Sequence, residues 1–219
     1  MTVAHRSLRS QVAEALRGGL VSGELEPGVV YSAPTLAVKF GVSATPVREA
    51  MLDLAKEGLV DAVRNKGFRV TVVSDHDLDE LTEIRELLEI PIVTRLAGHL
   101  STVDISALRR LAGRIEEAAA AGDLVGYVEA DREFHLRLLA LAGNEHLVTV
   151  VGELRARARL YGLHRLARQG DLDGSAHEHA ALLDALDAGD APAVEKLMRQ
   201  HLGHVRGIWA GSARSEIDA

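Results

Sequence analysis

Two residues that can bind a metal ion or carry a proton, Asp131 and His135, stand four positions apart in the stretch ADREFHLRLLA. Residues at this spacing lie on one side of a helix. That side is otherwise apolar, since it also carries Phe134, Leu138 and Leu139. A carboxylate and an imidazole directed into an apolar interior need partners, because an unpaired buried charge is strongly unfavourable. We therefore expect further polar groups to meet them.

Two more histidines are expected to point inward from separate helices. In the stretch HEHAALLDAL, His177 and His179 are two positions apart and so about 200° apart around a helix. His179 shares its side with the leucines of this stretch, and His177 does not. Near the end of the chain His204 lies at the margin of an apolar stripe. His201 lies within it, in line with Val194, Leu197, Met198, Val205 and Ile208.

Three histidines and one aspartate from three helices are a ligand set that suits one divalent metal ion. Imidazole nitrogens bind Zn, Ni, Mn or Fe, and a carboxylate adds a hard oxygen. The alternative is that Asp131, His135, His179 and His201 are separately hydrogen-bonded core residues. Helical periodicity alone leaves both interpretations open.

The elements that must position these residues are predicted to be mainly α-helices. The chain has 219 residues, of which 47% are hydrophobic and only 3% aromatic, and this favours packed helices over a β-sandwich. From residue 74 onward only helical periodicity occurs, interrupted at STVD, AAGD, AGNE, RQGDLDGS and AGD. We expect an antiparallel all-helical bundle over residues 74–219, which would hold the candidate metal ligands in its interior.

Residues 1–73 have a different pattern and are expected to form a separate domain. A helix is predicted from Ser7 to Val21 and a short one from Pro34 to Phe40, which Gly41 ends in a left-handed conformation. The next helix starts at Ser43, an N-cap residue, and runs through Gly58. Two short strands, LVDAV and FRVTVV, then flank the basic turn RNKG.

A helix that follows a tight helix-turn fits the DNA major groove, and its first residues meet the base edges. Arg48 is the candidate base contact, with Ser43 and Thr45 beside it at the start of the helix. The candidate contacts to the phosphate backbone are Arg64, Lys66 and Gly67 in the hairpin turn and Arg6 and Arg9 near the amino terminus.

The order SGELEPG, LAVKFGVSATPVREAMLDLAKEGLV and VRNKGFRV closely resembles the winged helix-turn-helix of the GntR family of bacterial transcription regulators, over about residues 7–72. The resemblance implies operator contacts by Arg48 and a wing tip at Gly67. Two departures remove further contacts, because Ala44 stands where the family usually has a basic residue and Thr35 where it often has arginine. They bear on the operator sequence more than on binding as such.

The motifs DxxxH at 131–135, SxxEH at 175–179 and MxxH at 198–201 resemble the FCD ligand-binding domain of the FadR-type subfamily, over about residues 77–210. This resemblance implies a metal at the four candidate ligands, with Zn preferred and Ni, Mn or Fe as alternatives, and a small carboxylate effector on the metal. It also implies an effector contact by Arg85. The alternative for Arg85 is an ion pair with Glu89, one turn further along the helix.

Composition excludes several classes of protein. The chain has no cysteine and hence no disulfides, no apolar run of roughly 18 residues, and no apolar signal segment at its start, so we expect a cytoplasmic protein with no membrane partner. The net charge is −7, yet residues 1–72 hold nine Lys/Arg and seven Asp/Glu, which leaves 16 and 25 for the remainder. The two segments therefore suit different partners.

The sequence predicts a transcription regulator, not an enzyme, that binds double-stranded operator DNA as a homodimer and responds to a small carboxylate. One alternative is a metal-dependent hydrolase with an accessory winged helix, for which Glu178 or Glu133 would be the general base. Each stands next to a candidate ligand and so points about 100° away from it. The other alternative, raised by Ala44, is a protein that keeps the fold but binds no DNA.

Overall fold

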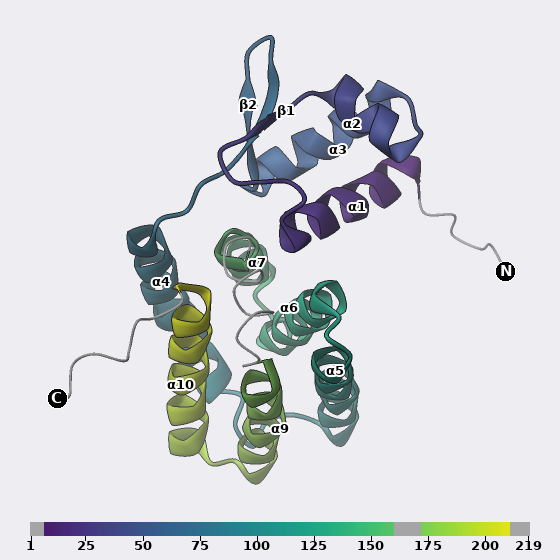
Figure 1. The fold of residues 1–219 in the computed structure, drawn as a ribbon. Helices are drawn as coiled ribbons and strands as arrows, with labels where there is room; N and C mark the ends of the chain where they lie inside the picture. The colour runs from purple at the N-terminus through teal and green to yellow at the C-terminus, as the bar shows by residue number, and fades with distance from the viewer. Residues whose placement is uncertain (1–6, 160–171, 211–219) are drawn as a thin grey trace, which may run out of the picture. The chain divides into compact units, whose positions relative to one another are not determined.

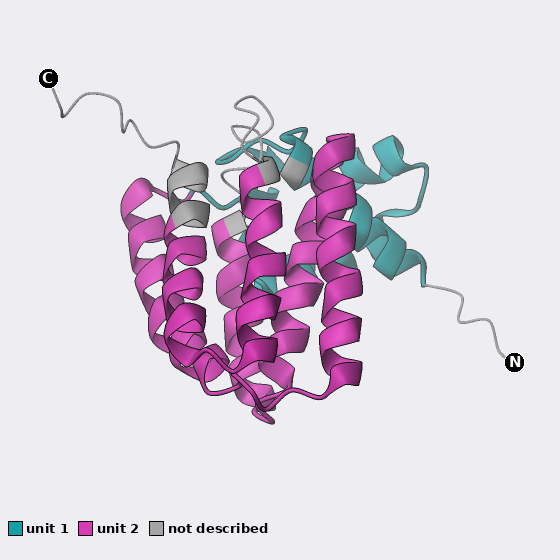
Figure 2. Cartoon of the chain, turned by 90° about the horizontal axis from the view of Figure 1, so that it is seen from below, with its two compact units in different colours: residues 1–72 teal, residues 73–219 magenta. Residues whose placement is uncertain are grey.

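The computed structural model describes residues 7–159 and 172–210. The chain divides into two compact units, Met1–Val72 and Val73–Ala219, coloured separately in Figure 2. This division lies one residue before the boundary expected from the sequence. Among the described residues no helix is long and apolar enough to cross a membrane.

The described part of the first unit contains three helices and a small sheet. Its helices are α1 (Leu8–Ser22), α2 (Ala33–Phe40) and α3 (Ala44–Lys56), and its strands are β1 (Val30–Tyr31), β2 (Val60–Val63) and β3 (Gly67–Val70). The sheet is antiparallel with the order β1-β3-β2, so the hairpin predicted from LVDAV and FRVTVV pairs with an extra strand that the sequence interpretation missed. Val47, Ala50, Met51 and Leu54 form the buried face of α3, as predicted.

The turn between α2 and α3 has the predicted geometry at Gly41 but not at Ser43. Gly41 ends α2 with φ +65°, the left-handed conformation that glycine adopts without strain. Ser43 occupies the N-cap position of α3, yet its side chain makes no capping hydrogen bond. The expected side-chain cap is therefore wrong. The exposed Ser43 hydroxyl is left outside the helix at the start of α3.

Two arginines of α1 hold α3 by ion pairs that use two nitrogens each. Nε of Arg9 donates to Oδ2 of Asp53 at 2.7 Å, and Nη2 of Arg9 donates to Oδ1 at 2.5 Å. Arg17 pairs in the same manner with Glu57, at 3.2 and 2.5 Å. Such forked contacts fix orientation as well as distance. α1 thus sets the orientation of the helix that carries Arg48.

The hairpin turn presents Arg64 and Lys66 to solvent, while Gly67 lies inside the sheet. The turn closes by a hydrogen bond from the Lys66 amide to the Val63 carbonyl at 3.0 Å, and Asn65 takes a left-handed φ of 60°. Gly67 has φ +136°, and a Cβ at this position would lie 2.2 Å from the Tyr31 carbonyl oxygen. Glycine is therefore required here by the close approach of β1 to β3.

The second unit is all-helical in its described part. Its helices are α4 (Asp75–Thr94), α5 (Thr102–Ala121), α6 (Leu124–Ala140), α7 (Glu145–Arg159), α9 (Leu172–Ala188) and α10 (Ala191–Ala210). A capping box starts α4, in which the Asp77 amide donates to the Ser74 hydroxyl and the Ser74 amide donates to the Asp77 carboxylate. The break expected over RQGDLDGS is wrong for residues 172–175, which belong to α9, and residues 168–171 lie outside the described residues.

These six described helices form a closed ring around one core (Figure 1). α10 packs between α4 and α9, α5 packs between α9 and α6, and α7 packs between α6 and α4. The loops after α4 and α9 meet at Gly98 and Gly189, where a Cβ added to Gly98 would lie 3.3 Å from the Cα atom of Gly189. Side chains that face inward from any of the helices therefore share a single interior.

Candidate functional site

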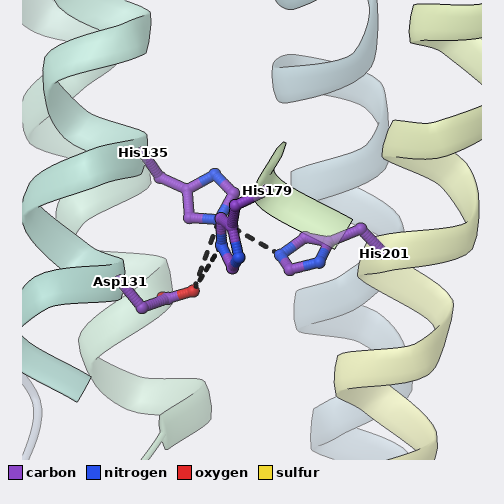
Figure 3. Close-up of side chains that lie close together, drawn as sticks. All are labelled: Asp131, His135, His179 and His201. Carbon is purple, nitrogen blue, oxygen red and sulfur yellow. Dashed lines mark hydrogen bonds and ion pairs between the residues drawn. The ribbon is translucent and has the colours of Figure 1, made fainter. Parts of the chain in front are cut away.

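Asp131, His135, His179 and His201 meet in the interior of the second unit (Figure 3). Nε2 of His135 lies 3.1 Å from Nε2 of His179 and 3.1 Å from Nε2 of His201. Oδ1 of Asp131 lies 3.1 Å from Nε2 of His179 and 3.4 Å from Nε2 of His135. One ligand atom from each residue falls within 4.8 Å of all the others.

The four side chains come from three helices, and all are buried. Asp131 and His135 lie on α6, His179 on α9 and His201 on α10, with exposed fractions of 6%, 1%, 1% and 2%. The predicted helical phases are therefore correct, and His177 is exposed as expected. His204 lies outside the described side chains. The ring of Phe134 stands edge-on to those of His135 and His179, which keeps this side of the cluster apolar.

In His179 and His201 the ring nitrogen that faces away from the cluster, Nδ1, indicates where the proton of each ring lies. Nδ1 of His179 is 3.1 Å from the Ala176 carbonyl oxygen, and Nδ1 of His201 is 2.8 Å from Oε2 of Glu178. Each acceptor requires a proton on Nδ1, so Nε2 of both rings carries only a lone pair in the neutral form. With His179 in this form and Asp131 ionised, the contact between Nε2 of His179 and Oδ1 of Asp131 joins two acceptors. A cation between them would satisfy both.

The distances fit a divalent ion. At metal–ligand distances of roughly 2.1 Å, adjacent ligands lie about 3.0 Å apart in an octahedron and about 3.4 Å apart in a tetrahedron. The four separations that join His135 and His179 to their neighbours span 3.1 to 3.4 Å. Four of the six separations among the three imidazole nitrogens and the carboxylate oxygen therefore match adjacent ligands in a metal shell, and all six are within 4.8 Å.

The environment keeps His135 and His201 in the form that binds metal. Burial lowers the pKa of His135 well below the usual value, and the nearby Arg155 guanidinium lowers it further. Burial also lowers the pKa of His201 to about 4, although the hydrogen bond to Glu178 opposes this shift. Both rings are neutral at pH 7, as metal coordination requires.

A buried ion-pair cluster adjoins the four candidate ligands. Nε of Arg85 donates to Oε1 of Glu89 at 2.8 Å, which confirms the ion pair that the sequence left as the alternative for Arg85. Nε and Nη2 of Arg155 donate to Oε2 of Glu89 at 3.2 and 2.5 Å, and Nη1 of Arg155 lies 3.5 Å from Oδ2 of Asp131. Burial by itself would raise the pKa of Glu89, but Arg155 and Arg85 hold it well below its usual range.

Arg155 is a site residue that the sequence interpretation missed. It lies on α7 at helical spacing from Val148, Val151 and Ala158, so its inward direction follows from the same periodicity that located the histidines. One polar atom of Arg85 is unsatisfied, because its buried Nη2 has no hydrogen-bond partner among the described residues. Burial, and then the charge of Arg155, lower the pKa of Arg85 to about 10, so it remains a cation at pH 7.

The candidate DNA contacts are distributed over three parts of the first unit. Ser43, Thr45 and Arg48 are exposed at the start of α3, and Arg48 makes no hydrogen bond or ion pair with any described residue. Arg64 and Lys66 are exposed in the wing turn. Their side chains are accessible to DNA.

The structure does not present the other three candidates as exposed DNA contacts. The side chain of Arg9 is engaged by Asp53 on α3, so its first contact is within the protein. Gly67 is the first residue of β3, and its lack of a side chain allows β1 to approach β3 closely. Arg6 lies outside the described residues.

Both carboxylates considered as general bases for a hydrolase are engaged elsewhere. Glu178 accepts a hydrogen bond from the outer nitrogen of His201, away from the side on which a metal would lie. Glu133 is exposed and pairs with Arg114 at 2.8 Å. Neither Glu178 nor Glu133 is therefore directed at the centre as a general base, and the hydrolase interpretation is not favoured.

Comparisons with known proteins agree with both halves of this description. Residues 8–70 match the family described as bacterial regulatory proteins, gntR family, and residues 80–204 match the FCD domain. The HTH-type transcriptional regulator McbR of Escherichia coli K12 is 30% identical over 188 residues, which cover 85% of each chain. A protein of Paenarthrobacter nicotinovorans named as the probable D-xylose utilization operon transcriptional repressor is 30% identical over 196 residues, covering 90% of this chain and 86% of its own.

A solved structure of E. coli McbR/YncC extends the likeness to the fold. It has a TM-score of 0.78 and 28% identity, and the match covers 94% of this chain and 99% of that one. These relatives are transcription regulators rather than enzymes. The chain therefore belongs to the GntR family of bacterial transcription regulators, in the FadR-type subfamily that carries an FCD domain.

Proposed function

We propose that this regulator binds operator DNA through residues 1–73 and is controlled by a small carboxylate that binds a divalent metal in residues 74–219. The observation that supports the metal is that one ligand atom from each of Asp131, His135, His179 and His201 lies within 4.8 Å of the others in a buried site. Zn²⁺ is the preferred ion, with Ni, Mn or Fe as alternatives.

The effector class follows from what the four protein ligands leave open. A six-coordinate ion held by four protein atoms keeps two positions, which a carboxylate can occupy. Three neutral imidazoles and one carboxylate leave the bound ion with a net positive charge, which favours an anion. The unpartnered Nη2 of Arg85 offers a second, charged contact for it. An anionic ligand is therefore favoured over a neutral one.

The DNA-binding role rests on the exposed side chains at the start of α3 and in the wing. Arg48 supplies the base contact, Ser43 and Thr45 support it, and Arg64 and Lys66 contact phosphates, with Arg6 as a further contact. Arg9 acts through its ion pair with Asp53 on α3, and Gly67 through the geometry of the wing. This function belongs to the cytoplasm, where bacterial operator DNA lies.

The proposed function is tested by measuring the operator Kd with and without the carboxylate. In fluorescence anisotropy, the protein should bind labelled DNA from the region upstream of the gene with a lower Kd than random DNA. One member of a panel of small carboxylates, added to Zn²⁺-loaded protein, should change the operator Kd by about 5- to 150-fold, the usual range of allosteric coupling.

The same panel added to chelated protein is the control, and it should leave the operator Kd unchanged. Equal binding to upstream and random DNA would contradict the regulator function. A carboxylate effect that persists without metal would contradict the metal-linked mechanism alone.

We also propose that the protein acts as a homodimer. A single winged helix with few basic residues binds DNA weakly, and two linked copies gain affinity at a two-half-site operator. Ile84 and Leu87 of α4, 43% and 69% exposed, offer an apolar surface for association. Light scattering at micromolar concentration should give about twice the chain mass of 23.5 kDa, and a monomer mass with and without DNA would contradict the dimer.

A further inference from the structure

Glu178 precedes the proposed ligand His179 in the sequence, yet its side chain contacts a different ligand. Oε2 of Glu178 accepts a hydrogen bond from Nδ1 of His201 at 2.8 Å, on the side of the ring opposite the nitrogen that faces the centre. Nε2 of Gln200 lies 3.5 Å from the other oxygen, Oε1. The Glu178 side chain is only 13% exposed, so its charge is partly removed from water. A charge-assisted hydrogen bond is stronger in such surroundings.

The partners of the outer nitrogens differ in charge. Nδ1 of His179 meets the neutral Ala176 carbonyl, whereas Nδ1 of His201 meets a carboxylate. α9 supplies both Glu178 and His179, whose side chains leave the helix about 100° apart. One turn of α9 thus directs His179 toward the centre and, through Glu178, also contacts His201 of α10.

We propose that Glu178 is a positioning residue of the metal centre that holds the His201 ring in its Nδ1–H tautomer and increases affinity for the divalent ion. This inference rests on the metal centre of the proposed function. A carboxylate acceptor at Nδ1 requires the proton to remain there, which leaves the Nε2 lone pair directed at the metal. Its negative charge also makes the imidazole a better donor and offsets part of the charge of the bound ion.

The test is a Zn²⁺ titration of tag-free, full-length protein that has been stripped with a chelator, in competition with a chromophoric chelator. We expect Glu178→Ala to raise the Kd for Zn²⁺ by about 10- to 100-fold, the range typical of lost partners of metal-bound histidines. Glu178→Gln should fall between the alanine variant and the natural protein, because the amide oxygen can still accept from Nδ1 but carries no charge.

The matched control is Glu195→Gln, which removes one negative charge from an exposed α10 carboxylate paired with Arg199. It should leave the Zn²⁺ affinity within about twofold, since exposed ion pairs contribute little. Melting temperatures of the metal-free proteins show whether each variant folds. A merely structural bond between α9 and α10 would lower the metal-free melting temperature of Glu178→Ala and leave the Kd unchanged.

Two results would overturn the inference in distinguishable ways. If the natural protein binds Zn²⁺ and Glu178→Ala binds it with the same Kd, the positioning role fails and the metal centre stands. If the natural protein takes up neither Zn²⁺ nor Ni²⁺ after supplementation, the proposed metal centre fails and the role of Glu178 fails with it. A Gln variant as weak as the Ala variant would contradict the tautomer role alone, because the amide oxygen can still accept from Nδ1.

Discussion

Replacement of His179 by alanine is expected to abolish tight metal binding, whereas replacement of His177 is expected to leave it intact. His179 Nε2 lies within 3.1 Å of ligand atoms on both Asp131 and His135, and His177 is exposed on another side of the same helix. The natural protein and His177→Ala should each retain about one ion per chain after Zn²⁺ supplementation and desalting. His179→Ala should retain close to none, with affinity lower by more than about 100-fold, because even indirect partners of a ligand are worth roughly 10- to 100-fold.

The same pair of variants should differ in the stabilisation that metal provides. An ion at 1,000 times its Kd stabilises the folded state by about 4 kcal/mol, and a chain of this size gains about 2 to 4 °C per kcal/mol. Zn²⁺ should therefore raise the melting temperature of the natural protein and of His177→Ala on the order of 10 °C. His179→Ala should gain little.

Elemental analysis and thermal melts, with and without chelator, measure both effects. The comparison within each variant removes the effect of the cavity that the lost imidazole leaves. Equal metal content in the two variants, or none in the natural protein, would identify these histidines as core residues that bind no ion.

The proposed metal ligands could be located from the sequence because they lie on long, regular helices. Helical phase separates His179 from His177 by about 200°, and the structure places only the first in the interior. The same phase places Arg155 beside Val151, so this residue was accessible to the same reasoning but lacked a motif to draw attention to it. What periodicity cannot supply is the partner across the bundle, such as Glu89 for Arg155 or Glu178 for His201, because helix neighbours depend on the order of packing.

The parts of the fold that the sequence did not predict are short or involve close backbone contacts. β1 is only two residues long, which is too short for an alternating pattern, and it forms because β3 offers it an antiparallel edge. Gly67 was interpreted as a flexible wing tip, whereas its conformation is imposed by the Tyr31 backbone. Arg9 was expected to meet phosphates, but Asp53 on a helix 44 positions away engages it. Each difference arises from a contact between segments that are distant in the sequence.

Arg48→Ala is expected to weaken binding to the operator by about 1 to 3 kcal/mol, or roughly 5- to 150-fold in Kd, and to weaken binding to random DNA much less. Arg48 is exposed at the start of α3 and has no partner among the described residues, so its guanidinium is available to contact two acceptors of a guanine in the major groove. The loss should be concentrated at one base position in each half-site, where the variant should accept other bases nearly as well.

The comparison variant is Arg64→Ala in the wing, because a phosphate contact carries no sequence information. It should weaken binding to operator and random DNA alike and should reduce the slope of log K against log salt by about one. Arg48→Ala should change the ratio of operator to random affinity, and Arg64→Ala should change mainly the salt dependence. Fluorescence anisotropy at several salt concentrations measures both quantities. If Arg48→Ala left the affinity ratio of the natural protein unchanged, Arg48 would be a solvated side chain, and specificity would have to come from Thr45, Ser43 or the shape of the DNA.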